Sequence, residues 1–286
     1  MIAHVAEASE HSGRVVLWLD PEAWCASALL DAPVRLAAAY GAEVETIIVL
    51  QGSDNDMEDV PVRRVARAFQ DTPKSGFAPS EQRFGLLAQR CRRSVETAGK
   101  RHQVRVRHAL AYGDAIDRIS EMCVARGPWN IVALPRLPAL GGPSVISTLL
   151  ANVSGATGFF LSGESPKAVR SRIVVVAEDV DRLPSMLRAA DRISGDGAAV
   201  RIIIGADTKS QHDELEAQVR LLTADAKNVV FESIGPTLGV PGALTELMAR
   251  LKPSIVIARF GGSAFADGRE LARASAVIRA PILIVR

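Results

Sequence analysis

The stretch of sequence that decides the fold occurs twice. Residues 129–136 read Trp-Asn-Ile-Val-Ala-Leu-Pro-Arg, and residues 253–260 read Pro-Ser-Ile-Val-Ile-Ala-Arg-Phe. Each stretch follows a segment with helical spacing and leads into a pair of glycines, Gly141-Gly142 in one case and Gly261-Gly262 in the other. A repeat of this length is a whole domain rather than a short solenoid unit. The sequence therefore predicts two copies of one domain.

Apolar runs typical of buried strands alternate with segments of helical spacing throughout both copies. We expect strands at 15–19, 44–50, 103–109, 131–134 and 158–161, and again at 173–177, 200–204, 229–232, 255–258 and 282–285. Strands that alternate with helices form a parallel sheet covered on both faces, wound by right-handed crossovers. The predicted fold class is α/β, with two tandem doubly wound five-stranded parallel-sheet domains at 1–162 and 171–286 and a polar linker at 163–170.

Composition narrows the class of protein and its partners. Hydrophobic residues make up 48% of the 286 residues and aromatic residues only 5%, which favours a core of aliphatic side chains. The net charge of +2 gives no reason to expect nucleic acid or an anionic membrane as a partner. No apolar run approaches the ~20 residues that span a bilayer, and the N-terminus does not resemble a secretory signal. We expect a cytoplasmic protein whose three cysteines are reduced.

Residues that could bind a ligand follow the strands, because open α/β sheets bind ligands beyond the carboxyl ends of their strands. The acids, arginines, glycines and hydroxyls at this edge are the candidates for nucleotide binding. They are Asp20, Arg136, Gly141, Gly142 and Ser144 in the first copy, and Asp179, Arg259, Gly261, Gly262, Ser263 and Gly268 in the second.

The order of these elements resembles the tandem form of the universal stress protein family, from about Arg14 to Arg286. The first strand ends in an acid in both copies, residues 113–119 and 129–132 resemble that family's third helix and fourth strand, and residues 280–285 resemble its closing strand. The resemblance implies domains of the adenine nucleotide alpha hydrolase-like fold. It also implies that 159–161 and 282–285 meet as dimerising strands do in single-domain members. We therefore expect an internal pseudo-dimer, with a homodimer as a further option.

Family members that bind ATP follow the fourth strand with Gly-x-x-Gly and, about nine residues later, Gly-Ser or Gly-Thr, whose amides and hydroxyl hold phosphates. Both copies depart from this pattern. Pro135 and Pro138 stand in the first loop, and a proline has no amide to donate. In the second copy Gly268 fits the late glycine, but Arg269 replaces the hydroxyl and Asp267 repels phosphate.

Each candidate residue has two interpretations. The glycine pairs form either an anion cradle or an ordinary turn before a helix. The resemblance gives Asp20 a contact with ribose or adenine, although an acid at this place also caps a helix. Arg136 and Arg259 either neutralise an anion or bridge to a nearby carboxylate.

The sequence contains no motif that specifies a reaction. It has no Walker A loop, no Gly-x-Ser-x-Gly elbow, no nucleophile placed beside a base, and no histidine pair with metal-ligand spacing, so we assign neither catalytic nor metal residues. Glu178 and Asp179 are similar to the acid pair of receiver domains, but the third strand of that copy lacks the acceptor aspartate. We expect a non-catalytic stress-response or regulatory protein with degenerate nucleotide loops, an unknown protein partner and no cofactor. The alternative is an ATP- or AMP-binding, slowly hydrolysing protein that uses one altered glycine loop.

Overall fold

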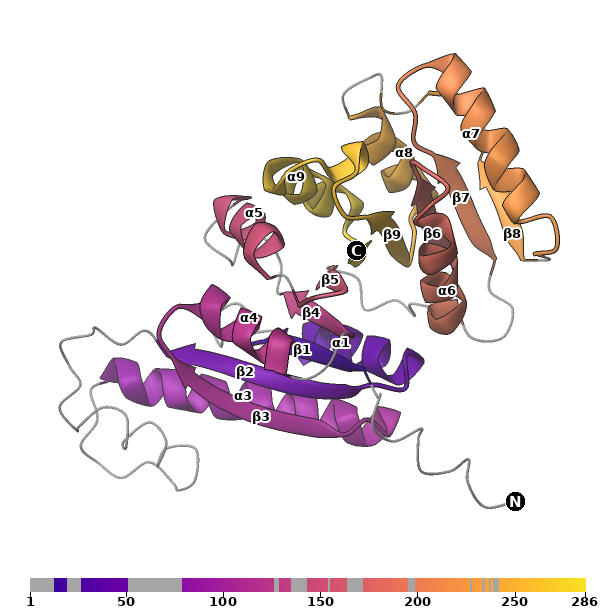
Figure 1. Cartoon of the computed structure of the whole chain (residues 1–286). Coiled ribbons are helices and arrows are strands. Elements are labelled where there is room, and N and C mark those ends of the chain that lie inside the picture. The colour runs from indigo at the N-terminus through magenta and orange to yellow at the C-terminus, as the bar shows by residue number, and fades with distance from the viewer. Residues whose placement is uncertain are drawn as a thin grey trace, which may run out of the picture. The chain divides into compact units, whose positions relative to one another are not determined.

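The computed structural model describes residues 13–19, 27–50, 79–125, 129–134, 143–153, 155–163, 172–194, 199–226, 228–232, 235–236, 238 and 242–286. The chain divides into two compact units (Figure 1). Unit 1 contains Met1–Pro135 and Ala151–Ala156, and unit 2 contains Arg136–Leu150 and Thr157–Arg286. The predicted linker at 163–170 lies outside the described residues except for Gly163, so the predicted domain boundary stays a prediction.

Unit 1 is built on a parallel sheet with strand order β3-β2-β1-β4. The strands are β1 (Arg14–Trp18), β2 (Glu43–Leu50), β3 (Val106–Tyr112) and β4 (Asn130–Leu134), and the helices are α1 (Ser27–Ala39), α3 (Pro79–His102) and α4 (Ala115–Ala125). Helices α1 and α3 pack against each other, and α4 packs against β1, β2 and β3. Asp114 caps α4, because its Oδ1 accepts the amides of Ile116 and Asp117 at 2.8 and 3.1 Å.

One predicted boundary in this unit is wrong. The third strand is predicted to begin at residue 103, but α3 continues through Gly99 to His102 and the chain turns at Gln103, whose φ is 58°. A Cβ on Gly99 would lie 2.5 Å from Val106 Cγ2 and 3.0 Å from the Val104 carbonyl oxygen. Gly99 is therefore required for the close return of the chain over the helix, and the following strand begins at Val106 rather than at 103.

Unit 2 has the strand order β5-β10-β9-β6-β7-β8. Its strands are β5 (Gly158–Leu161), β6 (Ile173–Ala177), β7 (Val200–Ile204), β8 (Val229–Glu232), β9 (Ile255–Arg259) and β10 (Ile282–Val285). Strands β6 to β10 pair in parallel, whereas β5 pairs antiparallel with β10 in a register that places Ile282 opposite Leu161. The two closing strands of the repeat are thus hydrogen-bonded to each other, which is the pairing on which the expected internal pseudo-dimer depends.

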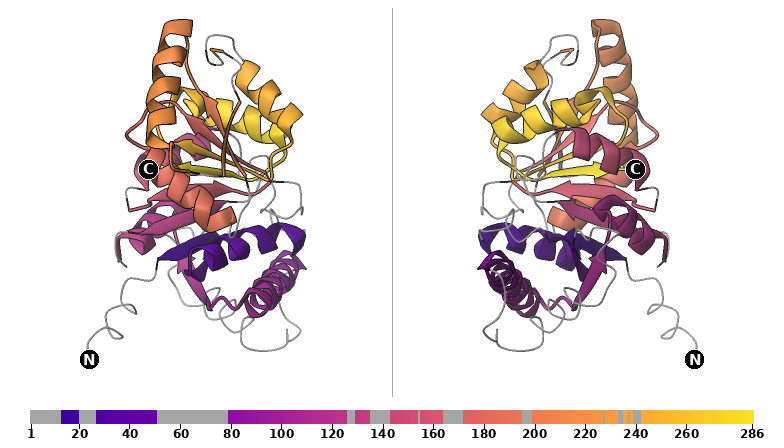
Figure 2. Two further views of the ribbon diagram at one scale, coloured as in Figure 1. Left: turned by 90° about the vertical axis from the view of Figure 1, so that its right-hand side faces the viewer. Right: turned by 90° about the vertical axis from the view of Figure 1, so that its left-hand side faces the viewer.

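Helices cover both faces of this second sheet. They are α6 (Leu183–Ser194), α7 (Lys209–Leu222), α8 (Ala243–Leu251) and α9 (Gly268–Ile278), with the 3₁₀ turn η3 (Ser263–Phe265) and most of α5 (Pro143–Asn152) grouped in the same unit. Figure 2 shows α6 and α7 on one face and α8 and α9 on the other. The central strand β6 is accordingly buried on both faces, with Val174, Val175 and Val176 at 0% exposure. The predicted α/β class and the order of its elements are confirmed.

Candidate functional site

The candidate site of unit 2 lies where the strand order changes direction. The chain passes from β6 to β7 to β8 on one side, then returns to form β9 and β10 on the other side of β6. Such a reversal leaves a crevice beyond the carboxyl ends of the two central strands, which is where α/β sheets bind ligands. Glu178 and Asp179 follow β6 directly, and the glycine loop at 260–263 follows β9.

Asp179 and Arg259, both predicted site residues, form an ion pair across this crevice. The Asp179 side chain is 25% exposed and that of Arg259 is 29% exposed. Asp179 also accepts the backbone N–H of Arg182 at 3.0 Å, and Arg259 donates to the Gly261 carbonyl oxygen at 3.3 Å. Of the two roles predicted for Arg259, the structure therefore has the bridge to a carboxylate.

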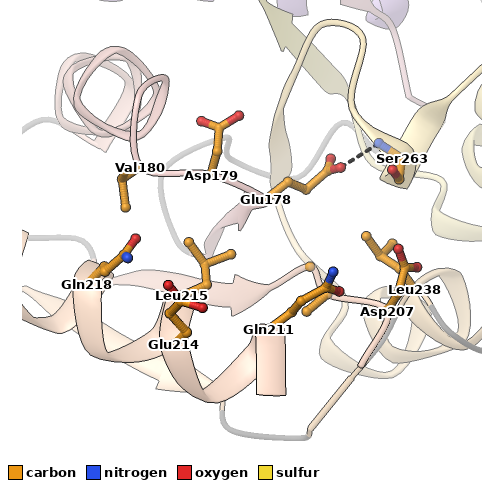
Figure 3. A pocket seen from close by; sticks show the side chains of 12 residues that line it. Glu178, Asp179, Val180, Asp207, Gln211, Glu214, Leu215, Gln218, Leu238 and Ser263 are labelled. Atoms are coloured by element: carbon orange, nitrogen blue, oxygen red, sulfur yellow. Dashed lines mark hydrogen bonds between the residues drawn. The ribbon is translucent and has the colours of Figure 1, made fainter. Parts of the chain in front are cut away.

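Glu178 occupies the glycine loop with its carboxylate (Figure 3). One carboxylate oxygen, Oε2, accepts the N–H of Ser263 at 2.5 Å, and the N–H of Ala264 also bonds to this carboxylate. The other oxygen, Oε1, is buried and has no hydrogen-bond partner among the described residues. Burial raises the pKa of Glu178 above its usual value, against the opposing effects of these two amides and of Arg259, and the negative charge of Asp207 raises it further.

The two glycines of the loop are required for different structural reasons. Gly261 has a φ of +69°, a left-handed conformation that favours glycine, and a Cβ there would touch nothing within 4 Å. Gly262 has an ordinary extended backbone, but a Cβ would lie 2.2 Å from Glu178 Oε1 and 2.8 Å from Arg259 Cγ. Gly262 is therefore the residue that allows the internal carboxylate to approach the loop.

The first amides of α9 also have acceptors within unit 2. Asp267 caps the helix and accepts the N–H groups of Arg269 and Glu270, each at 2.8 Å. The N–H of Gly268 donates to the Ser147 hydroxyl oxygen of α5 at 3.1 Å. The amides that the family resemblance assigns to phosphate are thus hydrogen-bonded to side chains of this chain.

A cavity of about 360 Å³ opens beside Glu178. It lies between the ends of β6 and β7, one face of α7, and Leu238 (Figure 3). Four carboxylates line it, together with two glutamine amides and a few aliphatic side chains; these polar residues are Glu178, Asp179, Asp207, Glu214, Gln211 and Gln218. Its described lining includes neither lysine nor arginine. The volume falls within the range of small-molecule sites, roughly 300–1,000 Å³.

The sequence does not identify the residues of α7 that line this cavity, nor the role of Glu178. Gln211, Glu214, Leu215 and Gln218 have the i, i+3, i+4, i+7 spacing that places them on one face of α7. The same spacing is typical of a solvated helix face, so it does not by itself indicate a cavity. Glu178 was recognised as an acid at the strand end but not as the acceptor for the glycine loop.

The predicted residues of the first copy cannot be placed together. Asp20, Arg136, Gly141 and Gly142 lie outside the described residues. Ser144 lies in the first turn of α5, but its side chain is also outside them. Their roles stay predictions.

In unit 1, a hydroxyl, an imidazole and a carboxylate contact one another in a row. The Thr46 hydroxyl lies 2.7 Å from His108 Nδ1, and His108 Nε2 lies 3.1 Å from Glu96 Oε1. This order is that of a catalytic triad, but Thr46 is only 1% exposed in the middle of β2. A substrate cannot reach that hydroxyl, so the array connects β2, β3 and α3 rather than performing a reaction.

Comparisons with known proteins match the chain by structure alone. No protein-family model and no curated protein matches its sequence. A universal stress protein from Archaeoglobus fulgidus DSM 4304 superimposes with a TM-score of 0.60 at 12% identity, over 96% of this chain and 99% of that one. A functionally unknown protein from Pseudomonas aeruginosa PAO1 gives 0.56 at 12% identity, over 97% and 94%. The cytoplasmic domain of a prokaryotic cation chloride cotransporter gives 0.54 at 12% identity, over 96% and 95%.

These matches extend over nearly the whole length of both partners in each comparison. Within the described part of the chain, no helix is both long enough and apolar enough to cross a bilayer. The resemblance predicted from the sequence is therefore confirmed at the level of architecture, and the chain has the fold of a tandem-sized universal stress protein.

Proposed function

We propose that this protein is a non-catalytic regulatory protein of the stress-response type, which acts by binding a protein partner rather than by turning over ATP. The observation that carries the proposal is the position of Glu178. Its carboxylate accepts the loop amides of Ser263 and Ala264, the groups that a nucleotide phosphate would need. The second copy therefore satisfies its glycine loop with an acid of its own.

The balance of charge also opposes a polyphosphate at this place. Two like charges 4 Å apart repel by about 4 kcal/mol at the effective dielectric constant near a protein surface. An anion at a helix N-terminus gains only about 0.3–1 kcal/mol when exposed. The carboxylates of Glu178 and Asp267 already accept from the loop and from the start of α9, so a phosphate would have to displace them or lie beside them. The electrostatic repulsion between a phosphate and these carboxylates therefore exceeds the free energy gained from the helix N-terminus.

A binding role is supported by aliphatic side chains exposed at the end of α7 and on the adjoining edge strand. Leu221 is 79% exposed, Leu222 is 55% exposed, and Val230 of β8 is 44% exposed. Burying such side chains against a partner contributes roughly 25 cal/mol per Å² of apolar surface. By contrast, the hydroxyl of the Thr46 array is inaccessible, which supports the absence of a reaction at that site.

Equilibrium binding of radiolabelled ATP with Mg²⁺, together with thermal unfolding, tests the proposal. A ligand present at 100 times its Kd stabilises the folded state by about 2.7 kcal/mol. We expect no binding and no shift in melting temperature at millimolar ATP, and no adenine nucleotide released when the purified protein is denatured. Binding with a micromolar Kd, or bound nucleotide in the purified protein, would contradict the proposal.

A variant of the same chain tests whether the Glu178 carboxylate excludes phosphate from the loop, or whether the loop is itself unable to bind phosphate. Glu178→Ala removes the internal acceptor of the Ser263 and Ala264 amides and leaves the glycine loop otherwise intact. We expect this variant to bind inorganic phosphate or ATP more tightly than the wild-type protein. The control, Glu246→Gln, neutralises an acid in the first turn of α8, away from the cavity lining, and should change nothing.

A further inference from the structure

We propose that the outer face of α3 binds an acidic helix of a protein partner. This face carries a row of exposed cations in unit 1, which consists of Arg90, Arg93 and Lys100 and is extended by Arg105 beyond the end of the helix. The inference rests on the function proposed above, because it names the chemistry of the protein partner expected there. Its grounds are the alignment of these cations, their lack of ion pairs within the described residues, and their number.

The first ground is that the row follows a single face of α3. Its exposed residues are separated by three, four and three positions, and they are Arg90, Arg93, Thr97 and Lys100. This spacing places side chains on one face of a helix, and Val95 on the opposite face is fully buried. At a rise of 1.5 Å per residue, the row extends about 15 Å along the helix. The cations therefore form one continuous surface rather than scattered charges.

The second ground is that the cations of this row have no ion pair among the described residues. Every other arginine of unit 1 whose side chain is described pairs with a carboxylate; these arginines are Arg14, Arg35, Arg92, Arg101, Arg107 and Arg118. Like charges three positions apart on a helix, such as Arg90 and Arg93, repel each other and destabilise the helix. The row therefore weakens α3, and carboxylates supplied by a partner would relieve the repulsion.

The third ground separates an acidic protein from other anions. A DNA-binding surface that makes roughly 6–10 phosphate contacts needs more cations than this row supplies. A helix that binds an anionic membrane also inserts large apolar side chains, and on this face of the described helix Leu86 is the one such side chain that is exposed. Guanidinium groups bind carboxylates through two parallel hydrogen bonds, and acids three and four positions apart on a helix repeat at the spacing of the row. An acidic helix therefore matches both its charge and its spacing.

Fluorescence anisotropy with a labelled helical peptide tests the proposal on the full-length protein. The peptide is rich in alanine, about 20 residues long so that it is helical by itself, and carries glutamates at the intervals of the row. A second peptide has glutamines in their place. We expect saturable binding of the glutamate peptide at low ionic strength, which weakens as salt is added, and no binding of the glutamine peptide.

Two variants of the chain locate the binding surface. Arg90→Gln combined with Arg93→Gln should weaken binding of the glutamate peptide at least about tenfold, which corresponds to about 1.4 kcal/mol. The matched control combines Arg188→Gln with Arg250→Gln, two exposed arginines of α6 and α8 that also have no ion pair among the described residues. It lowers the net charge equally and should leave the affinity unchanged. Unfolding in urea, followed by tryptophan fluorescence, verifies that unit 1 of the first variant is folded.

Four outcomes would overturn the proposal. Equal binding of the two peptides would show that charge is not recognised, and equal losses of affinity in the two variants would show that only the net charge matters. Tighter binding of a short DNA duplex, or of vesicles that contain phosphatidylserine, would assign the row to another class of partner if the α3 variant loses it. Absence of peptide binding would defeat this proposal alone, whereas ATP binding at the second copy would defeat the function proposed above.

Discussion

The position of Glu178 in the glycine loop can be tested by adding a single methyl group. In Gly262→Ala the new Cβ would lie 2.2 Å from Glu178 Oε1 and 2.7 Å from its Cδ, far closer than van der Waals contact allows. The carboxylate would therefore have to leave the amides of Ser263 and Ala264, or the loop would have to move. Overpacking of this kind costs about 1–3 kcal/mol. The lost charge-assisted hydrogen bonds belong to a class worth about 1.5–3 kcal/mol.

The informative quantity is the coupling between the two residues. Once Glu178→Ala has removed the carboxylate, the nearest remaining atom to the new Cβ of Gly262→Ala should be Arg259 Cγ at 2.8 Å, and the cost of the substitution should fall. We expect a coupling free energy of at least about 1 kcal/mol from the double-mutant cycle. Gly261→Ala is the matched control. Its cost of roughly 1–2 kcal/mol arises from the left-handed backbone and should be the same with or without Glu178.

Hydrogen exchange of the β9 amides under mild denaturant is the suitable assay. The three tryptophans, Trp18, Trp24 and Trp129, all belong to unit 1, so unit 2 contains no tryptophan that would report its own unfolding. Exchange through unfolding gives the free energy of opening for the strand that carries the loop. Additive costs for Gly262→Ala and Glu178→Ala would refute the placement of the carboxylate. A cost for Gly261→Ala that also depends on Glu178 would refute the separate roles of the two glycines.

Three further outcomes concern unit 1. Cys123 is fully buried, and burial raises the pKa of its thiol to about 11, so iodoacetamide at pH 8 should leave it unlabelled in the native protein and label it after denaturation, as mass spectrometry would show. Burial, and to a smaller extent the charge of Arg92, lower the pKa of His108 below its usual value, and Glu96 only partly opposes them. As the pH falls, the unfolded chain therefore binds a proton at His108 before the folded chain does. Stability of unit 1, followed by tryptophan fluorescence in urea, should therefore decline as pH falls from about 6.5 to the lowered pKa, and His108→Gln should flatten this decline. Asn130→Ala should cost about 2–4 kcal/mol in the same assay, because it leaves Arg14 Nε and the Cys123 carbonyl oxygen without their bonds at 2.7 and 2.8 Å, and a loss below 1 kcal/mol would contradict this.

The strands were predictable from sequence because burial on both faces leaves an unbroken apolar run. Residues 173–177, 200–204, 229–232 and 282–285 form strands with the predicted bounds. Boundaries that depend on packing were harder to predict. A glycine such as Gly99 is typical of a helix end because of its conformational freedom. Here it is instead the point where Val106 packs closely against the helix, and local propensity does not include that contact.

The site was only partly predictable for a similar reason. Strand ends and glycines identify the edge of the sheet, so Asp179, Arg259 and the loop at 261–263 were found. The acceptor for the loop depends on which of two adjacent acids turns toward it. Asp179 turns to Arg259 and Glu178 turns to Ser263, and residue type does not predict this because both residues are acids.

The same comparison distinguishes the two copies, because among the described residues only the second has an internal acid that satisfies its glycine loop. Glycines allow an anion to approach a loop closely, but they do not specify whether that anion is a phosphate or a side chain. The repeat aligns Glu178 and Asp179 with Leu19 and Asp20. Leu19 is 1% exposed and carries no charge, so the first copy has no internal acid at the position that satisfies the second loop. If ATP protects any part of this chain from hydrogen exchange, the protection should therefore fall on the first copy and leave the β9 loop unchanged, and protection of residues 260–264 would show that Glu178 is displaced.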